Sequence, residues 1–156
     1  MANISTIKEA ILLSREADVT LFIWGHRGLG KSSLVQQIAE DCDWGFVDMR
    51  CSQLEAADMR GLPDRGEDGR THYFPPSEMP TGDLTAEEIK EQLGPKPDKS
   101  DLEKLRIYKI NEAKLRPRNQ NGILFLDELN RAQDDVLQAA FQLVLDRKIG
   151  EYVVPP

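Results

Sequence analysis

Residues 25–32 read Gly-His-Arg-Gly-Leu-Gly-Lys-Ser, and this stretch decides the fold. It matches the phosphate-binding pattern G-x-x-x-x-G-K-[ST] without a mismatch. The apolar residues 20–24 precede it, and apolar residues at helical spacing resume at Leu34. The pattern therefore predicts a strand buried on both faces, then a glycine-rich loop, then a helix.

The residue types of this loop suit a phosphate ligand. Glycines let successive N–H groups turn towards the phosphates, and the start of the following helix adds partial positive charge. Lys31 would bridge the β- and γ-phosphates, and the Ser32 hydroxyl would bind Mg²⁺. We therefore expect ATP and Mg²⁺ as cofactors; the alternative is a glycine-rich turn that binds nothing. The candidate cradle comprises Gly25, His26, Arg27, Gly28, Leu29, Gly30, Lys31, Ser32 and Ser33.

A second motif lies at residues 123–128, which read Ile-Leu-Phe-Leu-Asp-Glu. Four apolar residues followed by two acids are typical of a Walker B strand, which ends at the ligand-binding carboxyl edge of a parallel sheet. Asp127 would hold Mg²⁺ directly or through water, and Glu128 would polarise the attacking water as general base. Glu128 and Lys31 are thus the candidate catalytic residues, and Ser32 and Asp127 the candidate metal ligands. Alone, such an acid pair could be a solvated turn.

Composition limits the class of protein. The chain has 156 residues, 40% hydrophobic and 30% charged, which suits one globular domain. Lys and Arg number 20 against 27 Asp and Glu, a net charge of −7 that argues against a nucleic-acid partner. No apolar run approaches the roughly 20 residues of a membrane span, and the first residues lack a secretory signal pattern. Two cysteines outside any CxxC pair indicate reduced thiols, so we expect a cytoplasmic protein without a membrane partner.

Apolar spacing and capping signals predict the remaining elements, and their alternation predicts an α/β fold with a parallel sheet. Residues 84–118 form a helical insertion whose weak apolar stripe predicts an exposed second helix. Its basic residues form a solvated helix face, or alternatively contact a nucleic-acid backbone. Strands are expected at 45–49 and 123–126, a short strand at 152–154, and helices at 4–15, 34–42, 85–93, 100–116 and 134–148, the last closed by Gly150.

With these motifs the chain resembles a MoxR-type AAA+ ATPase. The segments 25–33, 58–63, 69–76 and 126–132 carry the likeness, above all the run Asp-Glu-Leu-Asn-Arg-Ala at 127–132. The resemblance implies a P-loop NTPase fold, a three-layer αβα sandwich with a mostly parallel sheet. It also implies Mg-dependent ATP hydrolysis that remodels protein partners, a homo-oligomeric ring of six, and a partner with a von Willebrand A domain. Residues 58–76 would then face a neighbouring subunit or the pore, or form an ordinary surface loop.

The chain departs from the family pattern after Walker B. The family's sheet order is 5-1-4-3-2, and only strands 1, 2 and 3 have candidates here. We therefore expect a truncated single domain over residues 1–156, without strands 4 and 5 and without the helical lid. The alternative is that residues 152–154 form a strand that takes the place of the missing central one. The arginine finger, which contributes about 10³–10⁵ in rate where one is used, also has no candidate. Two functions stay open: an ATPase core, or a nucleotide-binding assembly module with little hydrolysis. A P-loop kinase is a third, against which Asp127-Glu128 argues.

Overall fold

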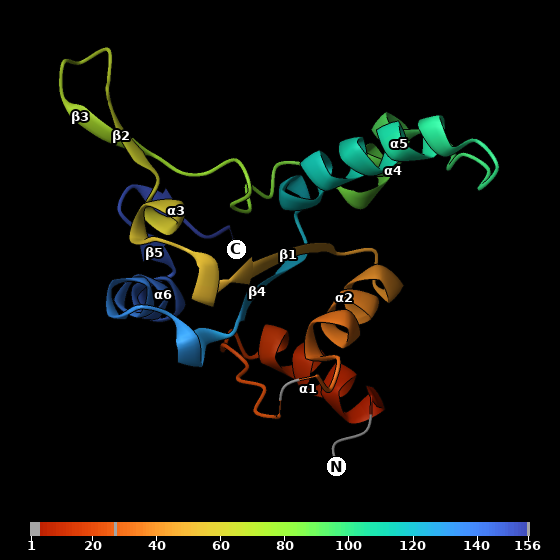
Figure 1. Cartoon of the computed structure of the whole chain (residues 1–156), viewed down its shortest axis with the longest axis horizontal. Coiled ribbons are helices and arrows are strands. Elements are labelled where there is room, and N and C mark those ends of the chain that lie inside the picture. Colours follow the sequence, from red (N-terminus) through yellow and green to blue (C-terminus); the bar gives the residue numbers. More distant parts are fainter. Residues whose placement is uncertain (1–3, 27, 156) are drawn as a thin grey trace.

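The computed structural model describes residues 4–26 and 28–155 (Figure 1). Its centre is a two-stranded parallel sheet of β1 (Gly45–Arg50) and β4 (Gly122–Asp127). The register runs without a break from Gly45 opposite Gly122 to Arg50 opposite Asp127. Both strands were expected from the sequence, and both end one residue later than predicted.

Helices cover both faces of this sheet (Figure 1). Helices α1 (Ile4–Glu16) and α2 (Lys31–Asp41) lie on one face. Helix α6 (Asp134–Asp146) and the short α3 (Ala56–Arg60) lie on the other. The layered α/β architecture predicted from the sequence is therefore confirmed.

Alternation along the two strands divides the core into two halves. On the α2 side, Phe46, Ile123 and Phe125 pack against buried aliphatic residues of α1 and α2. On the α6 side, Met49 and the partly buried Leu124 and Leu126 pack with the buried residues Cys51, Met59, Met79, Val136, Ala139, Ala140, Leu143, Ile149 and Tyr152. Each large buried side chain contributes about 1.5–3 kcal/mol to the stability of the fold. Burial on both faces therefore stabilises a two-stranded sheet that would be only marginally stable by itself.

The strand predicted at residues 20–24 is wrong. This segment has no regular secondary structure, and Phe22 and Trp24 are 67% and 86% exposed. In the described part of the chain, the parallel sheet contains only β1 and β4, and residues 20–24 pair with neither strand. Without a hydrogen-bonding partner for their backbone, these residues do not form a strand. Phe22 and Trp24 instead contact each other, with ring centroids 5.9 Å apart. The parallel sheet is thus narrower than the sequence suggested.

The C-terminal residues do not supply a stand-in for the central sheet. Strand β6 (Tyr152–Val153) forms, but it pairs antiparallel with β5 (Lys148–Ile149). Gly150, expected to close the preceding helix, instead forms the turn between these strands with φ of 57°. Helix α6 ends earlier, at Asp146, because Arg147 adopts a left-handed conformation with φ of 52°.

Residues 52–82 contain more structure than their composition suggests. A hairpin of β2 (Leu62–Arg65) and β3 (Thr71–Phe74) projects from the body (Figure 1). Gly61 at its base has φ of +85°, and a Cβ there would lie 1.9 Å from the carbonyl oxygen of Phe74. Only glycine fits this position, because both the backbone conformation and the close approach exclude a side chain.

Residues 84–118 contain α4 (Ala86–Leu93) and α5 (Leu102–Leu115), joined to β4 through the turn η2 (Arg116–Arg118). Thr85 and Glu88 form a capping box at the start of α4. Helix α5 buries no residue, so the expectation of an exposed helix is confirmed. In the described residues, no helix is both long enough and apolar enough to cross a membrane.

An imidazole clasp ties the hairpin to the β5–β6 turn. His72 Nδ1 lies 3.1 Å from Glu151 Oε2, and His72 Nε2 lies 2.9 Å from Asp68 Oδ1. Ionised carboxylates only accept hydrogen bonds, so both ring nitrogens must donate, which requires the imidazolium. The contact with Asp68, followed by that with Glu151, raises the pKa of His72. The N–H of Arg70 and then His72 lower the pKa of Asp68.

This clasp predicts a pH dependence near the turn of the hairpin. Because folding raises the pKa of His72, its contribution is complete below its ordinary pKa of about 6.5 and is lost as the pH rises through the folded-state pKa. Glu151→Gln should move the pKa of His72 back towards its ordinary value, as followed by NMR titration of the ring protons. Glu87→Gln, the same change on exposed α4, is the control. Identical His72 titrations in Glu151→Gln and the unmodified chain would contradict the clasp.

Candidate nucleotide-binding site

The glycine-rich loop leads directly into α2. Gly28 and Gly30 have φ of +75° and +70°, and a Cβ at either position would meet no atom within 4 Å. These glycines are therefore required for backbone conformation rather than for space. Gly30 is the N-cap of α2, and no described side chain caps the helix. The first-turn N–H groups of α2 thus remain available to an anion.

Lys31 is folded back onto the loop. Its Nζ donates to the carbonyl oxygens of Gly25 and His26, each at 3.0 Å. Neutral carbonyls are weaker partners for an ammonium than phosphate oxygens are. The Lys31 ammonium is thus held beside the loop by contacts that a bound phosphate could replace.

The other predicted cradle residues follow the loop into the helix. Leu29 is 61% exposed, and Ser33 lies in the first turn of α2. Arg27, also predicted for the cradle, lies outside the described residues.

The two motifs meet at one hydrogen bond. Ser32 Oγ donates to Asp127 Oδ2 at 2.9 Å across 95 positions of sequence. The other carboxylate oxygen of Asp127 accepts from the N–H of Glu128 at 2.8 Å. The structure therefore brings together the two residues that were predicted from the sequence as metal ligands.

This oxygen pair fits Mg²⁺. Hydroxyl and carboxylate oxygens are the donors that a hard divalent cation prefers. Within residues 4–26 and 28–155 no three His, Cys, Asp or Glu residues converge as a metal cluster. Mg²⁺ usually takes one or two protein ligands and completes its shell with phosphate oxygens and water.

Glu128 turns away from the strand just after Asp127. Its backbone is left-handed, with φ of 52°, at the start of the turn η3 (Leu129–Arg131). Its Oε2 accepts a hydrogen bond from Ser52 Oγ, in the turn η1 (Cys51–Gln53) that follows β1. Ser52 thus orients the carboxylate of Glu128, the residue predicted from the sequence as the general base.

Sequence reasoning missed Ser52 because it belongs to no motif. The available signal was topological: parallel neighbouring strands end at the same edge, so residues that follow β1 must lie near those that follow β4. Using that signal, however, required knowing that β1 and β4 pair.

Two further charged residues lie on the α2 face of the sheet. Asp48 lies two residues before Arg50, which is directly opposite Asp127 in the register. Burial, and next the negative charge of Asp127, raise the pKa of Asp48, whereas Arg50 lowers it. The negative charges of Asp48 and Asp127 therefore repel each other, and the Arg50 cation offsets part of that repulsion.

Helices on a parallel sheet, with a glycine-rich loop facing an Asp-Glu pair, define an α/β fold of the P-loop NTPase class. The chain belongs to the AAA family, the "ATPase family associated with various cellular activities", whose model matches residues 21–147. This membership supports ATP binding and hydrolysis in general. Neither a curated protein nor a solved structure gives a match to the chain.

The contact between Ser52 and Glu128 predicts a stability effect. Ser52→Ala removes a donor from a carboxylate and should lower the free energy of unfolding by about 1–2 kcal/mol, measured by urea denaturation. Ser52→Thr keeps the hydroxyl and should lose less than Ser52→Ala. Ser33→Ala, a hydroxyl removed from the first turn of α2, is the control. If Ser52→Ala is as stable as Ser52→Thr, the hydrogen bond contributes nothing.

Proposed function

We propose that this chain is an ATP-binding core of the MoxR branch of the AAA+ ATPases, and that it uses Mg-dependent ATP hydrolysis to remodel protein partners. The observation that carries the proposal is the hydrogen bond from Ser32 to Asp127, which joins the phosphate loop to the acid pair. A glycine-rich turn without a ligand has no need of that contact, nor of a lysine held beside the loop.

The cradle would bind the phosphates through backbone N–H groups of residues 25–33. Lys31 would exchange its two loop carbonyls for β- and γ-phosphate oxygens. Ser32 and Asp127 would hold Mg²⁺, which supplies positive charge to the phosphates when it is bound. These residues bind and orient the nucleotide without taking a proton.

Glu128 would act on the attacking water. Its carboxylate would accept a hydrogen bond from that water, orient it and draw its proton as general base. Ser52 positions the carboxylate by donating to one of its oxygens, which leaves the other free to accept. Because Glu128 directly follows Asp127, the base lies next to the metal ligand in the chain.

The finer assignment rests on segments outside the phosphate loop. The run Asp-Glu-Leu-Asn-Arg-Ala at 127–132 supports the MoxR branch. The projecting hairpin at 62–74 is the surface that we propose for contact with a neighbouring subunit. The homo-oligomeric ring of six is proposed from the family resemblance. A partner with a von Willebrand A domain and a cytoplasmic location complete the proposal.

A second function, a nucleotide-binding assembly module with little hydrolysis, is favoured by one observation. Residues 20–24, which lead into the phosphate loop, are not hydrogen-bonded into a sheet, and Trp24 next to the loop is 86% exposed. Catalysis needs groups held within a fraction of an ångström, whereas phosphate binding tolerates a looser loop.

Turnover and binding of ATP distinguish these functions. Glu128→Gln should lower Mg-dependent ATP hydrolysis by about 10²-fold or more while ATP still binds, because it removes the general base and keeps the cradle. Lys31→Ala should instead weaken ATP binding by about tenfold or more, because it removes a charge-assisted contact. Phosphate release and titration calorimetry measure the two effects, with the mass in solution recorded in the same buffer.

Matched changes far from the site serve as controls. Glu9→Gln on α1 and Lys96→Ala after α4 make the same chemical changes at exposed positions and should alter neither property. ATP binding without turnover in the unmodified chain would favour the assembly module. Equal turnover in Glu128→Gln and Glu9→Gln would contradict the catalytic role, and equal affinity in Lys31→Ala and Lys96→Ala would contradict the cradle.

A further inference from the structure

Arg50 is a charged residue beside the Ser32–Asp127 contact that belongs to neither sequence motif. It is the last residue of β1 and lies directly opposite Asp127 in the parallel ladder. Neighbouring strands of a sheet are about 4.8 Å apart, so these two residues start side by side at the edge where both strands end. The register therefore places an arginine next to a predicted metal ligand.

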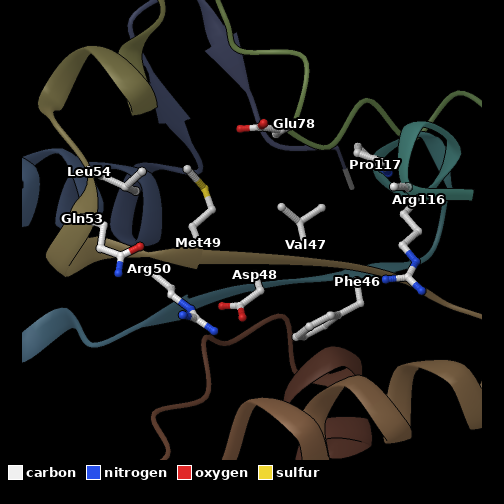
Figure 2. Close-up of a pocket in the computed structure, with 11 residues that line it drawn as sticks. Phe46, Val47, Asp48, Met49, Arg50, Gln53, Leu54, Glu78, Arg116 and Pro117 are labelled. Carbon is white, nitrogen blue, oxygen red and sulfur yellow. The ribbon is translucent and has the colours of Figure 1, made fainter. Parts of the chain in front are cut away.

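Arg50 and Asp127 also project from the same face of the sheet. Side chains alternate along a strand, and Phe46 packs on the α2 side, so Arg50, four residues later, projects on that side as well. Figure 2 shows Arg50 and Phe46 on the same side of β1. Asp127 contacts Ser32, in the first turn of α2, from this face. Arg50 thus shares a face with the two residues that we assign to Mg²⁺.

The Arg50 guanidinium has room for a further partner. Among the described residues, none of the ion pairs includes Arg50. Its charge nevertheless lowers the pKa of Asp48, so it acts on the acids at this edge of the sheet. Arg50 also borders a cavity of about 490 Å³ along the outer side of β1 (Figure 2), which leaves its long side chain space to turn.

The position of Arg50 selects one end of a bound nucleotide. Arg50 lies opposite Asp127, and Ser52, two residues after Arg50, donates to Glu128. In the proposed function, Asp127 holds the metal ion that bridges the β- and γ-phosphates, and Glu128 orients the water that attacks the γ-phosphate. A side chain that starts between these two acids therefore lies at the γ-phosphate end of the site.

Charge gives this end of the site a use for an arginine. Asp48, Asp127 and Glu128 place negative charge here, and a γ-phosphate would add more. Lys31 is held on the loop, on the opposite side of the cradle. A guanidinium can bind two phosphate oxygens at once through parallel N–H groups, and such charge-assisted bonds are about twice as strong as neutral ones.

We propose that Arg50 binds the γ-phosphate of ATP and thereby makes the site distinguish ATP from ADP. The inference rests on the proposed function, because it concerns the same nucleotide site. ADP has no γ-phosphate, so the Arg50 contact exists only with the triphosphate.

Nucleotide affinities of the full chain test this inference. The probes are ADP and the ATP analogue AMP-PNP, which resists hydrolysis, each titrated with Mg²⁺ in a calorimeter. Arg50→Gln should weaken AMP-PNP binding about tenfold and ADP binding less than about twofold, because it removes one charge-assisted contact to the γ-phosphate. Arg50→Lys keeps the charge without the planar fork and should lose less AMP-PNP affinity than Arg50→Gln.

Arg106→Gln, the same change at an exposed position of α5, is the control and should alter neither affinity. Circular dichroism establishes that each variant keeps its fold. Equal losses for AMP-PNP and ADP in Arg50→Gln would overturn the inference, as would affinities that match those of Arg106→Gln. Either result leaves the proposed function standing, whereas an unmodified chain that binds neither nucleotide would overturn both.

Discussion

The parallel ladder between β1 and β4 is the constraint on which the rest of this structure depends. It aligns Arg50 with Asp127, so the residues that follow each strand, Ser52 and Glu128, emerge at the same edge and meet. It also presents one face to α2, which brings Ser32 to Asp127. Two strands alone would not persist in water, and the apolar side chains packed on both faces supply the necessary burial.

Much of this arrangement could be predicted from local patterns. The two strands, the capped helix α4, the exposed helix α5 and the acid pair at the end of β4 are all present, because caps, helical spacing and apolar runs act through neighbours in sequence. Residues 20–24 show where local reasoning fails. Their apolar pattern is that of a buried strand, but a strand needs a hydrogen-bonding partner, and the pattern carries no information about which segment lies alongside. The pairing of Tyr152 with Ile149, rather than with the central sheet, has the same cause.

The candidate site divides in a similar way. Lys31, Ser32, Asp127 and Glu128 follow from motifs, because phosphate and Mg²⁺ chemistry demands those residue types at those positions. Ser52 and Asp48 do not, since their roles arise from the register of one strand against another.

Amide hydrogen exchange in the presence and absence of Mg²⁺ and ATP tests the central claim most directly. If the loop and the uncapped start of α2 bind the phosphates as we propose, nucleotide should slow exchange at residues 28–34 by about tenfold or more. Exchange in the exposed helix α5 should not change. Unaltered exchange at residues 28–34 under saturating nucleotide would contradict the account, as would slowing of the same size in α5.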